Sequence, residues 1–273
     1  LAVPIYNLPS SLVAGISLSL VPTLTEAAEG KRTRQSSELV ESSLKMTLLL
    51  SLPCSVGMAL FSRPILTLLF GREESSIALA APLLSALAFS VCSSCLMGIT
   101  NAILQAYRRA MLPILSMLVG TAVKILSAYL LIGIPSIGMY GAAISTLLCN
   151  TVAVGLNLYF IDRKTGVRYN ILKLSLAPLL ASFLSVGASF AIWCYLHTKI
   201  PPASAFLFSV ALCVPLYLWI GGRLGVYGPL EVQMLPGGEN ILKILDKFRC
   251  IKRKDGENEQ RGYDKRASRQ AEI

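Results

Sequence analysis

The stretch IALAAPLLSALAFSVCSSCLMGITNAILQ, residues 77–105, contains no charged side chain. A helix of about 20 residues, rising about 1.5 Å per residue, crosses the roughly 30 Å hydrocarbon core of a bilayer. This stretch is therefore long enough to span a membrane. Further apolar stretches of the same kind flank it on both sides, over 3–24, 44–61, 111–133, 138–160, 171–196 and 203–221. The sequence predicts an all-α membrane protein with about seven transmembrane helices.

The positive charges between these stretches fall mainly on alternate connections. They precede the second, fourth and sixth stretches, and a basic tail follows the seventh: Lys31, Arg32, Arg34, Lys45, Arg108, Arg109, Arg163, Lys164, Arg168 and Lys173. The other connections carry only Arg63, Arg72 and Lys199. Under the positive-inside rule, this asymmetry predicts that the first residue is outside and that the C-terminus is cytoplasmic.

The composition agrees with a membrane protein. Charged residues make up 15% of the chain and the mean hydropathy is +0.62, whereas about 25% charged residues are usual in soluble domains. The net charge of +10 lies at the ends of the stretches and in the tail, where anionic membrane lipids explain it. No base-reading motif accompanies it, so we expect no nucleic-acid partner.

The first residue is Leu1, and an apolar stretch follows it without a charged n-region, unlike a signal peptide. We therefore expect an N-terminal half of the same protein upstream, although a complete seven-span protein is the alternative. Within the chain we predict a five-span bundle over 1–165 and a final transmembrane pair over 166–222. The charged connection 25–43 is interpreted as an amphipathic linker.

The C-terminal part is predicted to lie in the cytoplasm, as a linker with an interfacial helix over 223–251 and a disordered basic tail over 252–273. Apolar residues recur there at helical spacing, with cations beside them: Ile241, Leu242, Ile244, Leu245 and Phe248. An amphipathic helix of this kind lies in the membrane interface. The tail has few large apolar side chains, which is typical of disorder.

Catalytic and metal-binding patterns are missing from the sequence. None of the seven stretches contains Asp or Glu, so an ion-coupling carboxylate is absent from them. Cys92 and Cys95 form a C-x-x-C inside an apolar stretch, and His197 is the single histidine. A metal centre needs further ligands and a redox pair needs an accessible thiolate. We predict no enzyme, no metal and no cofactor.

Prolines and amides give the stretches a polar, broken character. Prolines remove backbone donors and kink helices, and the candidates for kinks are Pro4, Pro9, Pro22 and Pro53. Amides lie at Asn7, Asn101, Gln105 and Asn150, with Asn157 two turns beyond the last of these. Each amide alone is explained by a hydrogen bond between helices. Together with the prolines, they favour the walls of a hydrated, mobile cavity.

Lys124 lies near the middle of the fourth stretch, in TAVKILSAYL. A lysine at the centre of a bilayer costs about 2.5–3.5 kcal/mol on insertion scales. Extension of the side chain to the membrane surface is one explanation, although the nearer end is roughly ten residues away. A second is that Lys124 faces an aqueous cavity and meets an anionic group such as a phosphate. A third is that it pairs with a carbonyl or with an acid in the N-terminal half of the protein.

Four runs of sequence resemble a known family. They are PIYNLPSSLVAGISLSLVPTLTEA at 4–27, ILTLLFG at 65–71, ILQAYRRAMLPI at 103–114 and VKILSAYLLIGIPSIGMYGAAISTLL at 123–148. The order and spacing resemble stage V sporulation protein B-like and polysaccharide-biosynthesis flippases. These belong to the multidrug/oligosaccharidyl-lipid/polysaccharide exporter superfamily, which includes lipid II flippases. The resemblance covers about 1–165 well and the last two stretches loosely.

The resemblance implies spans 8–14 of a fourteen-span, MATE-like fold in the bacterial cytoplasmic membrane. It also implies alternating-access transport of a polyprenyl-pyrophosphate-linked saccharide, with its headgroup in a cationic cavity and its tail beside the last two stretches. The first stretch lacks the arginine that Gram-negative lipid II flippases carry on their eighth span. Two alternatives are a multidrug/cation antiporter, which needs intramembrane acids, and a membrane-bound transferase, which needs a catalytic loop.

Overall fold

A computed structural model describes residues 2–29, 33–71, 74–134, 138, 140–165 and 171–226. All regular structure in this part of the chain is α-helical. The helices are α1 (Ala2–Glu29), α2 (Thr33–Leu60), α3 (Ser62–Phe70), α4 (Glu74–Ala106), α5 (Met111–Ile132), α6 (Tyr140–Thr165), α7 (Ile171–Leu196) and α8 (Pro202–Arg223). The predicted all-α fold is confirmed.

Each predicted membrane stretch corresponds to one long helix. Among the described residues, six helices are long and apolar enough to cross a membrane, namely α2 and α4 to α8. The first stretch, 3–24, lies within α1, which is continuous from Ala2 to Glu29. Of the linker and interfacial helix predicted over 223–251, only 223–226 are among the described residues, and the tail predicted as disordered, 252–273, lies outside them.

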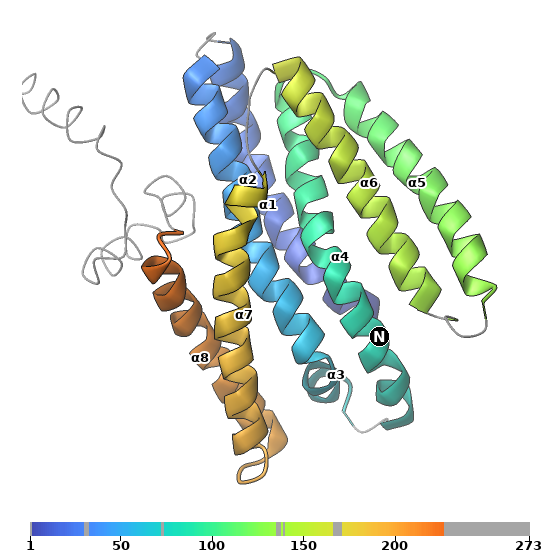
Figure 1. Ribbon diagram of the computed structural model, residues 1–273, viewed down its shortest axis with the longest axis vertical. Helices are drawn as coiled ribbons and strands as arrows, with labels where there is room; N and C mark the ends of the chain where they lie inside the picture. Colours follow the sequence, from blue (N-terminus) through green and yellow to red (C-terminus); the bar gives the residue numbers. More distant parts are fainter. Residues whose placement is uncertain are drawn as a thin grey trace, which may run out of the picture. The chain divides into compact units, whose positions relative to one another are not determined.

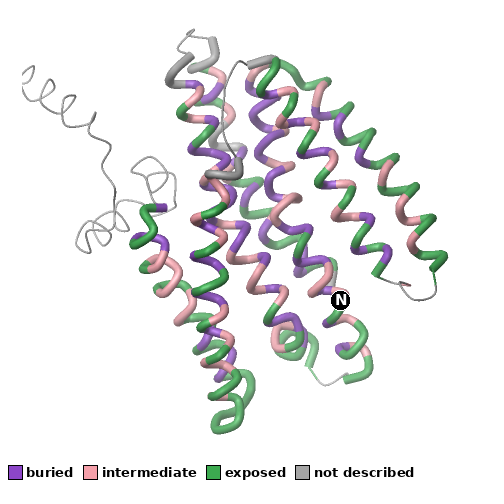
Figure 2. The backbone as a smooth tube through the Cα atoms, in the orientation of Figure 1, coloured by how far each residue is buried: buried purple, intermediate pink, exposed green. Residues whose placement is uncertain are grey.

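The chain divides into two compact units, residues 1–218 and residues 219–273. In the first unit, α4 is the central helix and packs against α1, α2 and α6 (Figure 1). α5 packs along α6, and α7 packs along α2. Figure 2 shows that α4 is lined with buried residues, whereas much of α5 is exposed. Of the second unit, the structure describes only the end of α8 and the turn after it.

The termini of the helices in the first unit gather at two ends. The end of α1, the start of α2, the end of α4, the start of α5 and the end of α6 lie at one end, at the top of Figure 1. The end of α2, the start of α4, the end of α5, the start of α6 and the turn between α7 and α8 lie at the other end. The first end carries Arg108, Arg109 and Arg163, and the second carries Arg63 and Lys199. The helical geometry therefore separates the cations as the alternation in sequence predicts.

The predicted linker 25–43 is wrong in extent, because most of it is helix. α1 continues to Glu29 and α2 already begins at Thr33. The side chains of Ser36, Val40 and Leu44 are buried. Hydropathy identified only the apolar part of α2, whereas packing extends the helix through its charged first turns.

A tight turn joins α4 to α5. The amide of Arg109 donates to the carbonyl of Leu104 at 2.9 Å, and the amide of Arg108 donates to the carbonyl of Gln105 at 2.9 Å. These two bonds form a Schellman motif, in which the first residue past the helix takes a left-handed conformation and is usually glycine. Here that residue is Arg108, with φ of 56°. The turn therefore has arginine at a position where glycine would have less backbone strain.

Aromatic side chains join α7 and α8 to the junction of α2 and α3. The ring of Phe61 lies 5.4 Å from Phe190, 6.2 Å from Trp193 and 5.6 Å from Phe206, each in an edge-to-face arrangement. Phe61 and Phe206 are buried together with Val186. Edge-to-face pairs contribute about 0.5–1.5 kcal/mol each beyond the area they bury. This cluster therefore packs the end of α7 and the start of α8 against the junction of α2 and α3.

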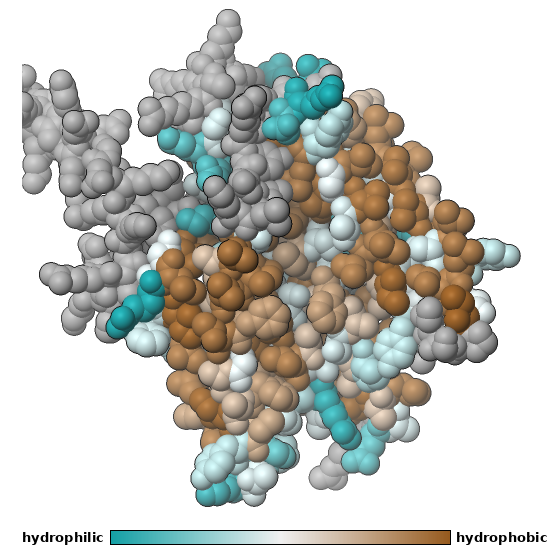
Figure 3. Space-filling model, viewed as in Figure 1, coloured by the Kyte–Doolittle hydropathy of each residue, from teal (hydrophilic) through white to brown (hydrophobic). Residues whose placement is uncertain are grey.

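The sides of the helices present apolar residues to their surroundings. Figure 3 shows hydrophobic side chains along the lengths of the helices on this face, with hydrophilic ones concentrated toward the ends. On α5, exposed apolar residues include Leu118, Ile125, Leu126 and Tyr129. Large apolar surfaces of this kind are unusual for a protein in water and suit contact with lipid. The chain is a multi-pass membrane protein.

Candidate functional site

Three helices meet at a group of polar side chains, which we call the amide cluster: Thr100, Asn101 and Asn157. The side-chain amide of Asn157 on α6 donates to Oδ1 of Asn101 at 2.7 Å and to Oγ1 of Thr100 at 3.0 Å. Both acceptors lie on α4, while Nδ2 of Asn101 lies 3.9 Å from Sδ of Met117 on α5. Asn157 is 0% exposed, and its Oδ1 has no hydrogen-bond partner among the described residues. The cluster therefore connects α4, α5 and α6 within the apolar region.

Asn150 lies two turns before Asn157 on α6 and is also buried. Its side-chain amide donates to the hydroxyl of Tyr6 on α1 at 3.2 Å. This bond joins helices that are far apart in the sequence, which is the interhelical role considered for each amide. The structure thus places Asn150 between helices. Asn7, which follows Tyr6 on α1, is exposed.

Lys124 lies on α5, on the same side of the helix as Met117. Met117, which contacts Asn101, is seven residues earlier, and a spacing of seven returns to nearly the same side of a helix. The same spacing places Lys124 about 10 Å farther along the helix than the amide cluster. Lys124 is exposed, and no acceptor for its ammonium occurs among the described residues. Ile125 and Leu126, which are also exposed, lie on other sides of α5 than Lys124.

The exposed candidates lie at different depths of the bundle. Asn7 is in the second turn of α1, Lys124 is eight residues before the end of α5, and Gln105 is in the last turn of α4. All three side chains are exposed. Asn101 is half-buried and takes part in the amide cluster. The candidates are therefore spread along the length of the helices and are not gathered in one closed pocket.

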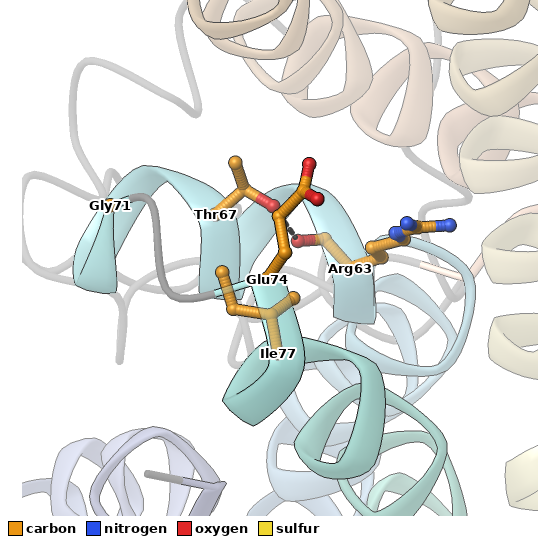
Figure 4. A pocket seen from close by; sticks show the side chains of 5 residues that line it. All are labelled: Arg63, Thr67, Gly71, Glu74 and Ile77. Atoms are coloured by element: carbon orange, nitrogen blue, oxygen red, sulfur yellow. Dashed lines mark hydrogen bonds between the residues drawn. The ribbon is translucent and has the colours of Figure 1, made fainter.

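A cavity of about 450 Å³ lies elsewhere, between α3 and the start of α4. It is lined by Arg63, Thr67, Gly71, Glu74 and Ile77 (Figure 4). None of these residues is among the candidates chosen from the sequence, because α3 falls in a predicted connection. Its amphipathic pattern, SRPILTLLF, is short but was present in the sequence as a signal.

The thiols and the histidine have structural surroundings. Ser51 donates to Sγ of Cys92 at 3.5 Å, and Oγ of Ser10 lies 3.9 Å from Sγ of Cys95. Both pairs connect neighbouring helices. Among the described residues, no group of three or more metal-binding side chains occurs. The ring of His197 stacks on Trp193 with centroids 4.9 Å apart, and its Nδ1 lies 2.8 Å from the carbonyl oxygen of Cys194.

The prolines occupy two kinds of position. Pro4 lies in the first turn of α1, where the missing amide proton has no helical acceptor, whereas Pro9, Pro22 and Pro53 lie inside α1 and α2. A proline inside a helix leaves the carbonyl four residues earlier without its usual donor. For Pro53 this is the carbonyl of Leu49, and the hydroxyl of Tyr217 on α8 donates to it at 2.9 Å. The sequence contained both residues but no signal of their contact.

Comparison with known proteins gives relatives for most of the chain. Residues 1–213 match the family described as lipid II flippase MurJ. An uncharacterized membrane protein, YabM, of Bacillus subtilis (strain 168) is 27% identical over 249 residues, covering 89% of this chain and 45% of that protein. The lipid II flippase MurJ of the same organism is 25% identical over 246 residues, covering 84% of this chain and 43% of that protein.

A solved structure has the same fold. The lipid II flippase MurJ in an inward closed conformation matches with a TM-score of 0.64 at 19% identity, over 81% of this chain and 45% of that chain. The chain thus spans less than half the length of the relatives it matches. Because the family match extends through all helices up to residue 213 in α8, the chain belongs to the lipid II flippase MurJ family.

Proposed function

We propose that this protein moves a polyprenyl-pyrophosphate-linked saccharide, a precursor of cell wall or polysaccharide, across the bacterial cytoplasmic membrane. Membership of the lipid II flippase MurJ family supports transport of a lipid-linked precursor. The protein acts as a transporter by alternating access and not as an enzyme. The chain supplies one part of the transport path, and the N-terminal half of the same protein supplies the other.

The observation that carries the proposal is the position of Lys124. It is an exposed cation within an apolar helix, on the same side of α5 as Met117, which lies beside the amide cluster, and no acceptor for it occurs in the described part of the chain. Pyrophosphate is a strong hydrogen-bond acceptor with multiple negative charges, and a lysine binds phosphate as a point charge. The retention of a residue that costs about 2.5–3.5 kcal/mol on insertion fits a role in binding this headgroup.

The polar residues at other depths extend this path. Gln105 near one end of α4 and Asn7 on α1 present exposed amides that hydrogen-bond sugar hydroxyls or water. Asn101 and Asn150 hold the helices together behind them. Pro9, Pro22 and Pro53 weaken the helices locally and provide sites at which α1 and α2 bend during alternating access.

The test is substitution of Lys124 in cells whose growth depends on this protein. Lys124→Ala is expected to leave the amount of protein in the membrane unchanged and to lower precursor translocation at least tenfold. Lys124→Arg retains the charge and is expected to retain part of the activity. Leu126→Ala, on another side of the same helix, is the matched control and keeps full activity. Normal translocation by Lys124→Ala would contradict the proposal.

A further inference from the structure

Helix α3 lies across the bundle end where α2 finishes and α4 begins, so it appears end-on in Figure 1. It is nine residues long and contacts both neighbouring helices. Ser62 and Leu66 are buried, whereas Leu68 and Leu69 are 41% and 57% exposed. A helix that lies across the ends of membrane spans with exposed apolar side chains suits the interface between headgroups and acyl chains.

The opposite edge of α3 is polar and faces the cavity. Arg63 and Thr67 are four residues apart and share this edge, and Oγ1 of Thr67 donates to the carbonyl of Arg63 at 2.9 Å (Figure 4). Glu74, the first residue of α4, lies across the cavity, and Ile77, which is 4% exposed, forms an apolar part of the lining. The cavity of about 450 Å³ is open to the surroundings, since Arg63, Gly71 and Glu74 are exposed.

Two opposite charges, Arg63 and Glu74, line the described part of the cavity. Arg63 and Glu74 are both exposed, and no ion pair joins them in the described part of the chain. In Figure 4 the guanidinium of Arg63 extends away from the carboxylate of Glu74. A ligand that fits both groups carries an acceptor anion for Arg63 and an N–H cation for Glu74 on one small framework.

We propose that this cavity binds the headgroup of a membrane phospholipid that carries both a phosphate and a primary ammonium. The phosphate accepts hydrogen bonds from Arg63, whose planar guanidinium suits phosphate oxygens. The ammonium donates to the carboxylate of Glu74, and the acyl chains lie beside Leu68 and Leu69. The charges select this headgroup, because a purely anionic lipid is repelled by Glu74 and a trimethylated ammonium has no N–H to donate.

The proposal is independent of precursor transport and is tested by binding. The purified chain in detergent is titrated with dihexanoyl phosphatidylethanolamine, dihexanoyl phosphatidylcholine and dihexanoyl phosphatidylglycerol, and the unfolding midpoint gives an apparent Kd for each lipid. Phosphoethanolamine, which lacks acyl chains, is the fourth probe. The variants are Arg63→Gln and Glu74→Gln, and Arg109→Gln at the other end of the bundle is the matched control.

Wild type and Arg109→Gln are expected to bind the phosphatidylethanolamine at least tenfold more tightly than the other three probes. Both Arg63→Gln and Glu74→Gln are expected to remove this preference, while their unfolding midpoints without lipid stay within about 1 °C of wild type. Equal binding of phosphatidylglycerol would overturn the proposed selection by two charges. Equal binding of phosphoethanolamine would show a site for the free headgroup without its acyl chains. An equal loss in Arg109→Gln would show unspecific attraction, and either result overturns the lipid site.

Discussion

The hydroxyl of Tyr217 on α8 donates a 2.9 Å hydrogen bond to the backbone carbonyl of Leu49 on α2. This carbonyl lies four residues before Pro53, and proline has no amide proton with which to satisfy it. A side chain from another helix therefore takes the place of the missing helical donor. In a membrane, where water is scarce, an unpaired carbonyl costs more than it does at an aqueous surface.

Removal of this donor is expected to destabilise the protein. Tyr217→Phe keeps the ring but leaves the Leu49 carbonyl without its partner, and a hydrogen bond between membrane helices contributes about 0.6–2 kcal/mol. The unfolding midpoint in detergent should fall by a few degrees. In Pro53→Ala, the amide of residue 53 again bonds Leu49, so Tyr217→Phe should cost clearly less in that background. Equal costs in both backgrounds would show that the two residues act independently.

Gly120 is expected to accept no side chain. A Cβ added there would lie 2.9 Å from the carbonyl oxygen of Cys149 and 3.2 Å from Cβ of Ala153, both on α6. Gly120→Ala therefore separates α5 from α6 and should lower the unfolding midpoint. Gly155→Ala on α6, where nothing lies within 4 Å of the added atom, is the control. It should be neutral or stabilising by about 0.5–1 kcal/mol, because alanine favours helix. Equal shifts for the two variants would contradict the close packing.

Arg108→Gly is expected to stabilise the turn between α4 and α5. The residue has φ of 56°, a conformation that costs an L-residue about 1–2 kcal/mol and costs glycine almost nothing. The unfolding midpoint should rise by about 2–4 °C for each kcal/mol gained. The matching turn after α8 has Gly225 at this position, with φ of 65°, so Gly225→Arg should lower the midpoint. A lower midpoint for Arg108→Gly would mean that arginine contacts outweigh the strain.

Asn157 is expected to contribute more to stability than the bond between Asn150 and Tyr6. Asn157→Leu removes two hydrogen bonds, of 2.7 Å and 3.0 Å, and leaves Asn101 and Thr100 without their donor. At about 0.6–2 kcal/mol for each bond, the midpoint should fall more than it does in Tyr6→Phe, which removes one bond of 3.2 Å. A smaller effect for Asn157→Leu would mean that the leucine side chain compensates by packing.

Membrane orientation is expected to follow the positive charges, with Arg109 in the cytoplasm and Ser75 outside. A cysteine introduced at either of these two exposed positions, in a background in which all seven native cysteines are replaced by serine, reports the orientation through an impermeant thiol reagent in intact cells. Ser75→Cys should react, and Arg109→Cys should react only after lysis. Ser36 lies on the same side as Arg109 in this prediction, but it is 4% exposed and is therefore a poor labelling position. Labelling of Arg109→Cys in intact cells would contradict the predicted orientation.

The sequence by itself determined the helical membrane fold and the places where it spans. Apolar runs as long as 77–105 leave a chain no other way to satisfy its backbone in lipid, so length and hydropathy are enough. The sequence also placed the cations at the ends of the helices, because residues such as Arg108 and Arg109 lie between two apolar runs. Lys124 was recognisable because a cation in an apolar run is conspicuous without any knowledge of its neighbours.

Only the tertiary structure decided which polar groups meet. Tyr6 and Asn150 are 144 residues apart, and Leu49 and Tyr217 are 168 residues apart, so no local pattern relates them. The length of α2 and the existence of α3 were also beyond hydropathy: the charged start of α2 is helical because it packs, and α3 is too short for a span. The cavity beside Arg63 and Glu74 exists because chain reversal brings the two helices that carry them together, and that proximity is a property of packing and not of composition.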